Sequence, residues 1–469
     1  MSTTYDLIVI GAGPVGENVA DYAHRDGLSV VVVESELVGG ECSYWACMPS
    51  KALLRSGSAL RAAQRVAGAA PADAKLDPIA VLARRDSFTS NWSDAGQVDW
   101  LQGAGIDLVR GHGRITGERE VTVETPDGEH RILRATHAVA VTTGSAALLP
   151  DIPGITEVAP WTSREATAVE VIPESVIILG GGVVATEMAT AYQALGSQVT
   201  LVARGSVLGG QEPFVGDAVS AGLRELGVTI VHGSPTSVTR EDGVVTLALG
   251  DESVSGAELI VATGRTPRTG DIGLDHIGLK PGTWLDVDDH LQVHGFDWLY
   301  AAGDVNHRAL LTHQGKYQAR AAGKVIAARA NGTQIVSTPW SDHVATADHA
   351  AVPQVIFSEP EVSAVGLTAA AAEAAGLRTR VVDYELGWVA GSSLQADGYS
   401  GKARIVVDED RGVIVGATFV GQDVAELIHA ATIAVVGEVP LSRLWHAVPS
   451  YPTMSEVWLR LLETYRSEA

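Results

Sequence analysis

Residues 5–20 read YDLIVIGAGPVGENVA, and this stretch decides the fold. A compact apolar run at 5–10 leads directly into GAGPVG at 11–16, and a helical pattern continues to about residue 24. A second apolar run, VVVVE at 30–34, ends in an acid. A strand, a glycine-rich turn, a helix and a strand with a terminal acid form a dinucleotide-binding βαβ unit. We therefore predict an α/β fold that opens with a nucleotide-binding domain.

Each residue of the glycine-rich turn has its own role. Gly11 makes the tight turn, Gly13 lets the backbone approach a pyrophosphate, and Gly16 lets helix and strand pack closely. The helix that starts near Pro14 offers free N–H groups and a positive dipole end to the phosphates. Glu34 stands where a carboxylate can hold both hydroxyls of a ribose.

The same pattern recurs 169 residues later. An apolar run at 176–179 leads into GGGVVA, which contains Gly180, Gly182 and Ala185, and the strand QVTLVAR follows at 198–204. The chain therefore carries two Rossmann-like domains. Two such cradles indicate two dinucleotides that exchange electrons, most simply FAD and a nicotinamide.

The second cradle ends in Arg204 where an NAD-binding unit has an acid. An arginine pairs with a 2′-phosphate that a carboxylate would repel, and Ala185 in place of the third glycine agrees with this. We predict NADPH in preference to NADH. The alternative is that Arg204 is a solvated surface charge.

Composition limits the partners. The 469 residues exceed what one hydrophobic core organises, so three or four domains are expected. The formal net charge of −23 disfavours nucleic acid or an anionic membrane as a partner. Strand-like residues begin at Tyr5, with no charged segment or long apolar run before them, so we expect neither signal peptide nor membrane span and a cytoplasmic location.

Cys42 and Cys47 are the two cysteines of the chain. In a reducing cytoplasm such a close pair is more typical of catalysis or metal binding than of structure. Zinc would require further Cys or His ligands nearby, and we predict no metal site. Pro49 suits the first turn of a helix, so Cys47 is expected near a helix N-terminus, where the dipole favours a thiolate.

At this point the sequence resembles the FAD-dependent pyridine nucleotide–disulfide oxidoreductases of class I, which include glutathione reductase, dihydrolipoamide dehydrogenase and mercuric reductase. The resemblance covers almost the whole chain. It rests on seven ordered motifs: GAGPVG at 11–16, GGECSYWACMPSK at 39–51, TTGS at 142–145, GGGVVATE at 180–187, ATGRTP at 262–267, AAGDV at 301–305 and VIFSEPEVSAVGLT at 355–368.

The resemblance implies two Rossmann-like domains and an α+β dimerisation domain, in a homodimer whose active sites use residues of both subunits. The expected parts are an FAD domain at 1–153, an NAD(P) domain at 154–270, a central segment at 271–345 that completes the FAD site, and a dimerisation domain at 346–469. From the residues themselves, 56–100 are expected to be helical, and strands are expected to resume near 109–115 and 133–141.

The resemblance also implies residue roles. Electrons would pass from NAD(P)H to FAD, then to a disulfide between Cys42 and Cys47, and on to a small-molecule substrate. Cys47 would face the flavin, and Cys42 would attack the substrate. Lys51 and Glu187 would form an ion pair beside the flavin N5. The remaining cofactor contacts would be Gly40, Gly113, Thr143, Gly144, Gly264, Arg265, Asp304, Thr312 and His313.

One residue departs from the family pattern. The motif His-Pro-Thr-x-x-Glu, whose histidine moves protons for the interchange thiol, reads YPTMSE at 451–456. Glu456 is kept, but Tyr451 replaces the histidine, and a tyrosine, with a pKa near 10, is a poor base at neutral pH. His446, five residues upstream, is an alternative base.

Several reactions stay open. The first is reduction of a disulfide, with Tyr451 acting as an acid. The second is reduction of a soft metal ion, as in mercuric reductase, although the C-terminus lacks that enzyme's cysteine pair. The third is quinone or dye reduction directly by the flavin. A redox-sensing flavoprotein with little turnover is a further class.

Overall fold

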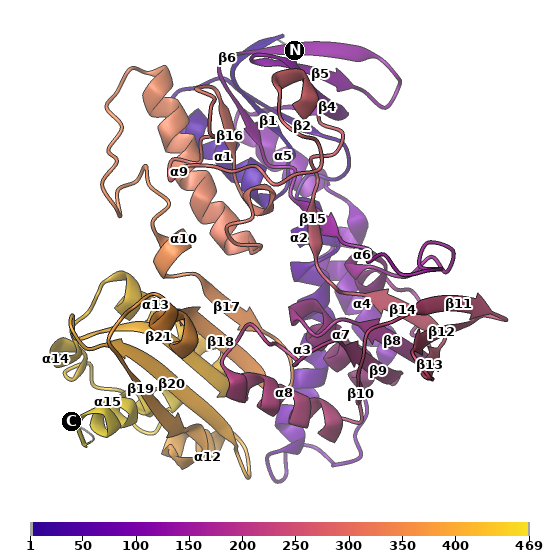
Figure 1. Ribbon diagram of the computed structural model, residues 1–469, viewed down its shortest axis with the longest axis vertical. Helices are drawn as coiled ribbons and strands as arrows, with labels where there is room; N and C mark the ends of the chain where they lie inside the picture. Colours follow the sequence, from indigo (N-terminus) through magenta and orange to yellow (C-terminus); the bar gives the residue numbers. More distant parts are fainter. Residues whose placement is uncertain (1–2, 468–469) are drawn as a thin grey trace. The chain divides into compact units, whose positions relative to one another are not determined.

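The computed structural model describes residues 3–467, and the chain divides into two compact units (Figure 1). One unit comprises the residues up to Pro49 with Asp86–Leu148 and Gly264–Asp348. The other comprises Ser50–Arg85, Leu149–Thr263 and the residues from His349 onward. Each unit is thus assembled from three separated segments, and we call them the first and the second unit.

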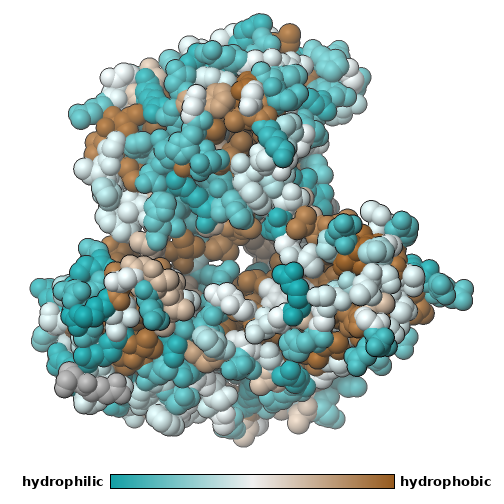
Figure 2. All heavy atoms as spheres, in the orientation of Figure 1, coloured by the Kyte–Doolittle hydropathy of each residue, from teal (hydrophilic) through white to brown (hydrophobic). Residues whose placement is uncertain are grey.

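Hydrophilic residues cover much of the face seen in Figure 2. This agrees with the formal net charge of −23, because a strongly charged chain keeps its charges in water. In the described part of the chain, no helix has both the length and the apolar character needed to cross a bilayer.

The first unit is built on a seven-stranded sheet. Its order is β3-β2-β1-β6-β5-β4, with β16 paired to β6. The contacts of β1 with β2 and β6, of β2 with β3 and of β6 with β16 are parallel, whereas β4, β5 and β6 pair antiparallel. The strands are β1 (Thr4–Ile10), β2 (Val30–Glu34), β3 (Asp107–Arg110), β4 (His112–Gly117), β5 (Glu120–Glu124), β6 (His130–Val141) and β16 (Leu299–Ala301).

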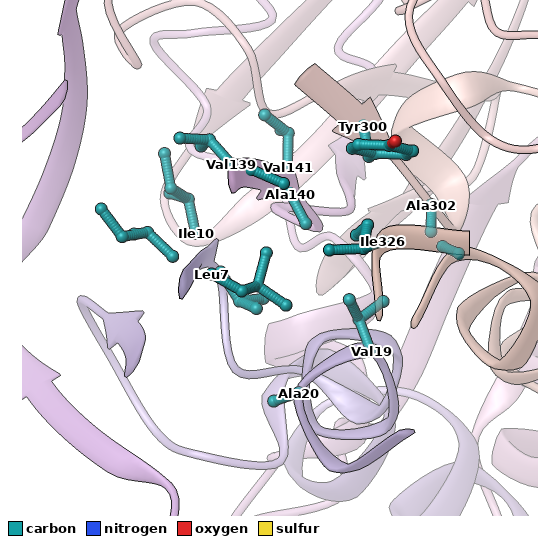
Figure 3. Packing of buried hydrophobic residues seen from close by; sticks show 14 of the residues in the cluster. Leu7, Ile10, Val19, Ala20, Val139, Ala140, Val141, Tyr300, Ala302 and Ile326 are labelled. Atoms are coloured by element: carbon teal, nitrogen blue, oxygen red, sulfur yellow. The ribbon is translucent and has the colours of Figure 1, made fainter. Parts of the chain in front are cut away.

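Two helices cover this sheet, α1 (Pro14–Arg25) and α9 (Thr312–Ala330). Figure 3 shows the apolar side chains between helices and strands, including Leu7, Ile10, Val19, Ala20, Val139, Val141, Tyr300 and Ile326. The near-continuous apolar runs of β1 and β2 are what a parallel strand buried on both faces requires. This core fixes the carboxyl ends of β1 and β2, where the glycine-rich turn lies.

The redox stretch forms one short helix and the start of one long helix. Gly40–Tyr44 is helix α2, and α3 runs from Cys47 to Gln64. Gly39, before α2, has a φ of 106°, a left-handed conformation that glycine adopts without strain. The predicted helix start near Cys47 is therefore confirmed.

The second unit contains a four-stranded parallel sheet of order β10-β9-β8-β14. Its strands are β8 (Ser175–Leu179), β9 (Gln198–Ala203), β10 (Thr229–His232) and β14 (Glu258–Val261). Helix α7 (Val183–Ala194) connects β8 to β9, and α8 (Pro213–Glu225) connects β9 to β10. A three-stranded meander, β11 (Ser237–Glu241), β12 (Val244–Leu249) and β13 (Glu252–Gly256), precedes β14.

A five-stranded antiparallel sheet, β17-β18-β21-β20-β19, forms the C-terminal part. Its strands are β17 (Pro353–Ile356), β18 (Glu361–Gly366), β19 (Thr379–Glu385), β20 (Gly401–Asp408) and β21 (Val413–Gly421). Helices α13 (Ile428–Val436) and α15 (Val457–Ser467) follow it. Two sheets with parallel βαβ units and this α+β part confirm the predicted fold class.

One local expectation was confirmed and one was wrong. Strands do resume near 109–115 and at 133–141, as β3, β4 and β6, and Gly111, with a φ of 147°, separates β3 from β4. The helical stretch expected at 56–100 is interrupted: α3 ends at Gln64, α4 covers Pro78–Phe88 and α5 covers Ala95–Gly103. Pro71 lies between α3 and α4, where a helix could not continue without losing a backbone hydrogen bond. Pro78 is the first residue of α4, a position at which its missing N–H costs nothing.

Candidate active site

The glycines of the first turn have the geometry of a phosphate cradle. Gly11 has a φ of 101°, and a Cβ there would lie 2.7 Å from the carbonyl oxygen of Thr142. A Cβ on Gly16 would lie 1.9 Å from Gly11 O, so only glycine lets α1 approach the turn. By contrast, a Cβ on Gly13 would meet no atom within 4 Å. The open space at Gly13 lies at the N-terminus of α1, where an anion is stabilised.

Glu34 ends β2 with its carboxylate turned back to the cradle. Its Oε2 accepts a hydrogen bond from Ala12 N at 2.6 Å, and its Oε1 accepts one from Glu36 N at 2.7 Å. Burial raises the pKa of this carboxyl, and the two N–H donors lower it in part. A carboxylate has further lone pairs, so it can still accept ribose hydroxyls.

Further polar groups gather at the carboxyl end of the first unit's sheet. Asp304 accepts a hydrogen bond from Ser145 Oγ at 2.5 Å, and Arg265 Nε lies 3.7 Å from its carboxylate. Burial raises the pKa of Asp304. Thr143 Oγ1 is buried without a hydrogen-bond partner, and Gly144, with a φ of 72°, has open space beside it. A dinucleotide with many hydroxyls and phosphate oxygens fits these residues.

Cys42 lies in α2, and Cys47 is the first residue of α3. Both are free thiols and partly buried. Cys42 hydrogen bonds with Cys47, and Cys47 Sγ lies 3.3 Å from the hydroxyl of Thr312 at the start of α9. The fold therefore brings the cysteine pair to Thr312, which lies 265 positions after Cys47 in the chain.

The two thiols differ in their electrostatic surroundings. The hydrogen bond to Cys47, then burial and the charge of Cys47, raise the pKa of the Cys42 thiol. The hydrogen bond with Thr312 and the charge of Lys316 act in the opposite direction. The N-terminus of α3 favours the thiolate on Cys47. Because one thiolate disfavours a second so near, the pair is set to hold one thiolate and one thiol.

The loop around the cysteines is held from both sides. Glu41 pairs with Arg268 at 2.9 Å. Tyr44 is buried, and its hydroxyl donates to Val38 O at 3.1 Å. Trp92 Nε1 donates to the carbonyl oxygen of Tyr44 at 3.2 Å. Tyr44 therefore packs inside the first unit.

Lys51 and Glu187 form an ion pair in the second unit. Lys51 Nζ lies 2.7 Å from Glu187 Oε2, and the Glu187 side chain is almost fully buried. Glu187 Oε1 also accepts from Phe357 N at 3.1 Å, and Lys51 lies over the Phe357 ring. A lysine held in this way is a fixed cation. Its predicted place beside a flavin stays a prediction.

The second cradle repeats the geometry of the first. A Cβ on Gly180 would lie 2.3 Å from Ala262 O, whereas one on Gly182, the N-cap of α7, would meet no atom within 4 Å. Ala185 is fully buried in α7. Arg204 follows the last residue of β9 and is exposed. The open space and the adjacent cation fit a nucleotide phosphate.

Tyr451 and Glu456 lie in the C-terminal part of the second unit, but in different surroundings. Tyr451 is 75% exposed, and His446 is exposed as well. Glu456 is buried, with Oε1 2.5 Å from Arg460 Nη2 and with Oε2 lacking a hydrogen-bond partner. Within the described residues, Glu456 thus has one carboxylate oxygen left to receive a donor.

The other predicted residues take varied positions. Gly40 opens α2, where a Cβ would lie 2.8 Å from the Cα of Gly13, so the redox stretch abuts the first cradle. Gly113 lies in β4 against Val33 and Ile10, so its hydrogen atoms face the core. Gly264 accepts a backbone hydrogen bond from Leu148 at 2.9 Å. His313 is exposed in the first turn of α9.

Comparison with known families identifies both halves of this arrangement. Residues 5–326 match the family described as pyridine nucleotide-disulphide oxidoreductase, and residues 352–461 match that family's dimerisation domain. The chain belongs to the pyridine nucleotide-disulphide oxidoreductases. The family predicted from the sequence motifs is therefore confirmed. The chain is an oxidoreductase of the flavoprotein disulfide reductase type, with NAD(P)H as electron donor.

Two curated relatives cover nearly the full chain. A mercuric reductase of Streptomyces lividans is 30% identical over 99% of this chain and 97% of its own length. A dihydrolipoyl dehydrogenase of Chlorobaculum tepidum is 29% identical over 97% of this chain and 96% of its own. Among solved structures, the HOCl-induced flavoprotein disulfide reductase RclA from Escherichia coli, as a Cu(II) complex, has a TM-score of 0.83. It is 22% identical and covers 98% of this chain and 99% of its own, which shows a shared fold.

Sequence reasoning missed two charged residues of this oxidoreductase. Glu17 follows the third glycine in the first turn of α1, and its buried Oε1 has no hydrogen-bond partner. Lys316 lies one turn after Thr312 in α9, and its charge lowers the pKa of Cys42. The sequence carried a signal for Glu17, because a carboxylate at a helix end that receives a phosphate would repel it.

Proposed function

We propose that this chain reduces a small disulfide, or another thiol-reactive substrate, with electrons from NADPH that pass through FAD and the Cys42–Cys47 pair. The observation that carries the proposal is the pair itself. The two thiols hydrogen bond with each other, one at a helix N-terminus and both near the Thr312 hydroxyl. A pair so placed can close to a disulfide and open again.

The residues of the first unit would hold FAD. The α1 N-terminus and Gly13 would bind the pyrophosphate, Glu34 the adenosine ribose, and Asp304 the ribityl or phosphate region. The remaining surface of the FAD site would be lined by Gly11, Pro14, Gly16, Gly40, Gly113, Thr143, Gly144, Gly264, Arg265, Thr312 and His313. When bound, FAD supplies two-electron transfer between a nicotinamide and a disulfide.

The sulfur chemistry belongs to this chain's residues. The Cys42 thiolate would attack a substrate disulfide, form a mixed disulfide and release one thiolate. The Cys47 thiolate would then attack Cys42 Sγ, which releases the second substrate thiolate and closes the Cys42–Cys47 disulfide. Two electrons thus leave the pair for each substrate disulfide. Lys51, fixed by Glu187, would supply a cation near the redox centre.

NADPH is proposed from the second cradle. Gly180, Gly182 and Ala185 would bind the pyrophosphate, and the exposed guanidinium of Arg204 is free to pair with a 2′-phosphate. NADH, which lacks that phosphate, would gain nothing from this pairing.

We further propose that the chain works as a homodimer. The dimerisation domain supports this, as does the exposure of Val448 (87%) and Tyr451 (75%) in the single chain. Tyr451 and Glu456 would complete the partner's site, where the Tyr451 hydroxyl would act as a proton donor to a leaving thiolate.

The deciding experiment compares Cys42→Ser with Cys47→Ser in the FAD-loaded protein. We expect both to lower disulfide reduction by NADPH on the order of 10²–10³-fold, because each removes one of the two sulfurs needed to close the disulfide. Direct reduction of a quinone by the flavin should persist in Cys42→Ser.

The matched control is Ser43→Ala, which changes the segment between the two cysteines without touching a thiol. It should keep most of the disulfide activity. Undiminished disulfide reduction by Cys42→Ser would refute the thiol route and leave direct flavin reduction of quinones as the function.

Reduction of a soft or redox-active metal ion is a second candidate. It is favoured by adjacent thiols, which bind soft metals well, and by the absence of the usual histidine, since a metal ion needs no proton on a leaving thiolate. The names of the Streptomyces lividans relative and of the RclA complex point the same way. Anaerobic turnover with Hg(II) or Cu(II), compared with a small disulfide, would rank the two substrates.

A further inference from the structure

Helix α2 carries Cys42 and is fixed inside the first unit at both of its ends. Its first residue, Gly40, abuts the first cradle, and its last residue, Tyr44, is buried. Between them, Glu41 directly precedes Cys42 and forms an ion pair with Arg268, whose Nη2 lies 2.9 Å from Glu41 Oε1. We call this ion pair the α2 tether, because it holds the residue next to a reactive thiol.

The other end of the tether is attached to a two-stranded ribbon. The ribbon consists of β7 (Ser145–Ala147) and β15 (Arg265–Pro267), which pair antiparallel. Arg268 directly follows β15, and its Nε donates to the carbonyl oxygen of Ser145 at 3.3 Å. The Ser145 hydroxyl in turn donates to Asp304. The tether therefore joins α2 to the ribbon that also holds Asp304, and α2 and β15 lie close to each other in Figure 1.

The tether is only partly open to solvent. The side chain of Glu41 is 23% exposed and that of Arg268 is 37% exposed. Salt and water screen such a pair less than a fully exposed one. A charge-assisted hydrogen bond of this length restricts the movement of Glu41, and hence of the neighbouring Cys42.

The position that the tether holds is close to that of the closed pair. Cys42 already hydrogen bonds with Cys47 while both are free thiols. Two groups that are held near each other have a high effective concentration, which favours the bond between them. Restricting α2 therefore favours closure of the Cys42–Cys47 disulfide.

We propose that Glu41 and Arg268 are positioning residues that shift the equilibrium of the Cys42–Cys47 pair toward the disulfide. This inference rests on the proposed function, in which the pair opens and closes during turnover. Neither residue exchanges electrons or protons with the pair. Their effect is to keep Cys42 within reach of Cys47.

The test measures the equilibrium of the full-length protein with mixtures of oxidised and reduced dithiothreitol near pH 7. The two thiols pass two electrons and two protons to oxidised dithiothreitol, whose S–S bond opens as the Cys42–Cys47 bond forms. Acid quenching, alkylation and mass spectrometry give the closed fraction. Glu41→Met and Arg268→Met should each lower the equilibrium constant for closure about two- to fivefold, the range that a partly exposed ion pair supports.

A purely electrostatic role makes a different prediction for Arg268. Removing a cation near a thiolate destabilises the open pair, so Arg268→Met would then favour closure, whereas Glu41→Met would disfavour it. The tether requires both variants to shift the equilibrium toward the open pair. Any other combination of shifts overturns the proposal.

A double variant and a control complete the design. If the two residues act through their mutual contact, Glu41→Met combined with Arg268→Met should shift the equilibrium no further than either change alone, and additive shifts contradict the tether. Arg114→Met is the matched control, because it breaks another 2.9 Å ion pair of the first unit, with Glu124. It should keep the wild-type equilibrium constant, and a similar shift there would reduce the effect to general loosening of the unit and refute the proposal.

The same measurement separates this inference from the proposed function. If the wild-type pair stays open at every ratio of oxidised to reduced dithiothreitol, the proposed function itself is wrong. If the wild-type pair closes and both single variants match it, only the positioning role is refuted.

Discussion

Glu456 carries its charge inside the dimerisation domain with one oxygen paired and one not. Arg460, one turn later, neutralises Oε1 at 2.5 Å, while Oε2 is buried without a hydrogen-bond partner. A buried acceptor without a donor is costly, which suggests that the site suits a donor that this chain does not place there. An imidazole at position 451 would supply such a donor and a base.

This gives a prediction for Tyr451→His. The imidazole should raise kcat/KM for a small disulfide at pH 7 by at least about tenfold, because a base near neutrality returns to the site. Steady-state assays at saturating NADPH measure it.

Tyr451→Phe is the control and should give no gain. If Tyr451→His gives no gain either, position 451 does not reach the thiols of either subunit.

At the residue scale, the sequence predicted what is encoded locally. The glycines of both cradles, Glu34 and the cysteines stand in motifs with fixed spacing, so their places followed from pattern. The effect of Lys316 on Cys42 escaped prediction because the two residues are far apart in the chain, and only the folded approach of α9 to the cysteines brings them close.

The second βαβ unit is the element proposed to select the nicotinamide. Strand β9 ends at Ala203, and Arg204 is the exposed residue that follows it. If Arg204 binds a 2′-phosphate, cofactor selectivity depends on the residue at the end of β9. The sequence predicted the strand to reach Arg204; the structure ends it one residue earlier, which places the guanidinium in the loop.

Arg204→Glu should therefore invert the cofactor preference. We expect kcat/KM with NADPH to fall about 10- to 100-fold, because a charge-assisted hydrogen bond is replaced by repulsion, while the value with NADH changes little. Initial rates with both nucleotides measure the ratio.

Arg224→Glu makes the same charge change at an exposed position of α8 and should leave the ratio alone. Equal losses with both nucleotides in Arg204→Glu would show that Arg204 does not read the 2′-phosphate.

Elements were predicted well where apolar runs and glycine turns agree, as in β1, β2 and β8. Their boundaries were predicted poorly where a single residue decides. Gly111 divides an apparently continuous strand by adopting a left-handed φ, and the segment after Gln64 leaves the helix although its alanines favour one. Such breaks depend on tertiary contacts that composition does not encode.

For the whole molecule, acidity and stability are linked through buried carboxyls. Burial raises the pKa of Glu17, Glu34, Asp304, Asp348 and Glu361. A carboxyl whose pKa is higher in the folded than in the unfolded chain stabilises the fold fully below its unfolded pKa. That contribution is lost as pH rises through the folded value. These carboxyls therefore lower the free energy of unfolding as pH rises above about 5, whereas carboxyls with a lowered pKa raise it.

Glu361 offers the cleanest test, since it lies in β18, away from the thiol pair in the sequence. Burial, Asp423 and Glu359 raise its pKa from 4.5 to about 7. Glu361→Gln removes this titration, so the variant should gain roughly 1–3 kcal/mol in free energy of unfolding relative to wild type between pH 4.5 and 8. Denaturant unfolding at both pH values measures it.

Glu373→Gln, an exposed substitution in helix α11 (Ala369–Ala374), is the control. If the difference in free energy of unfolding between wild type and Glu361→Gln does not change with pH, Glu361 is ionised already at pH 5.

Cys42 and Cys47 are the two cysteines of the chain, so the number of free thiols gives the oxidation state of this pair directly. A reagent that counts sulfhydryls finds two per subunit when the pair is open and none when it is closed, with no background from elsewhere. The redox midpoint potential of the cysteine pair can thus be measured with a chromogenic thiol reagent, even in protein from which FAD has been removed.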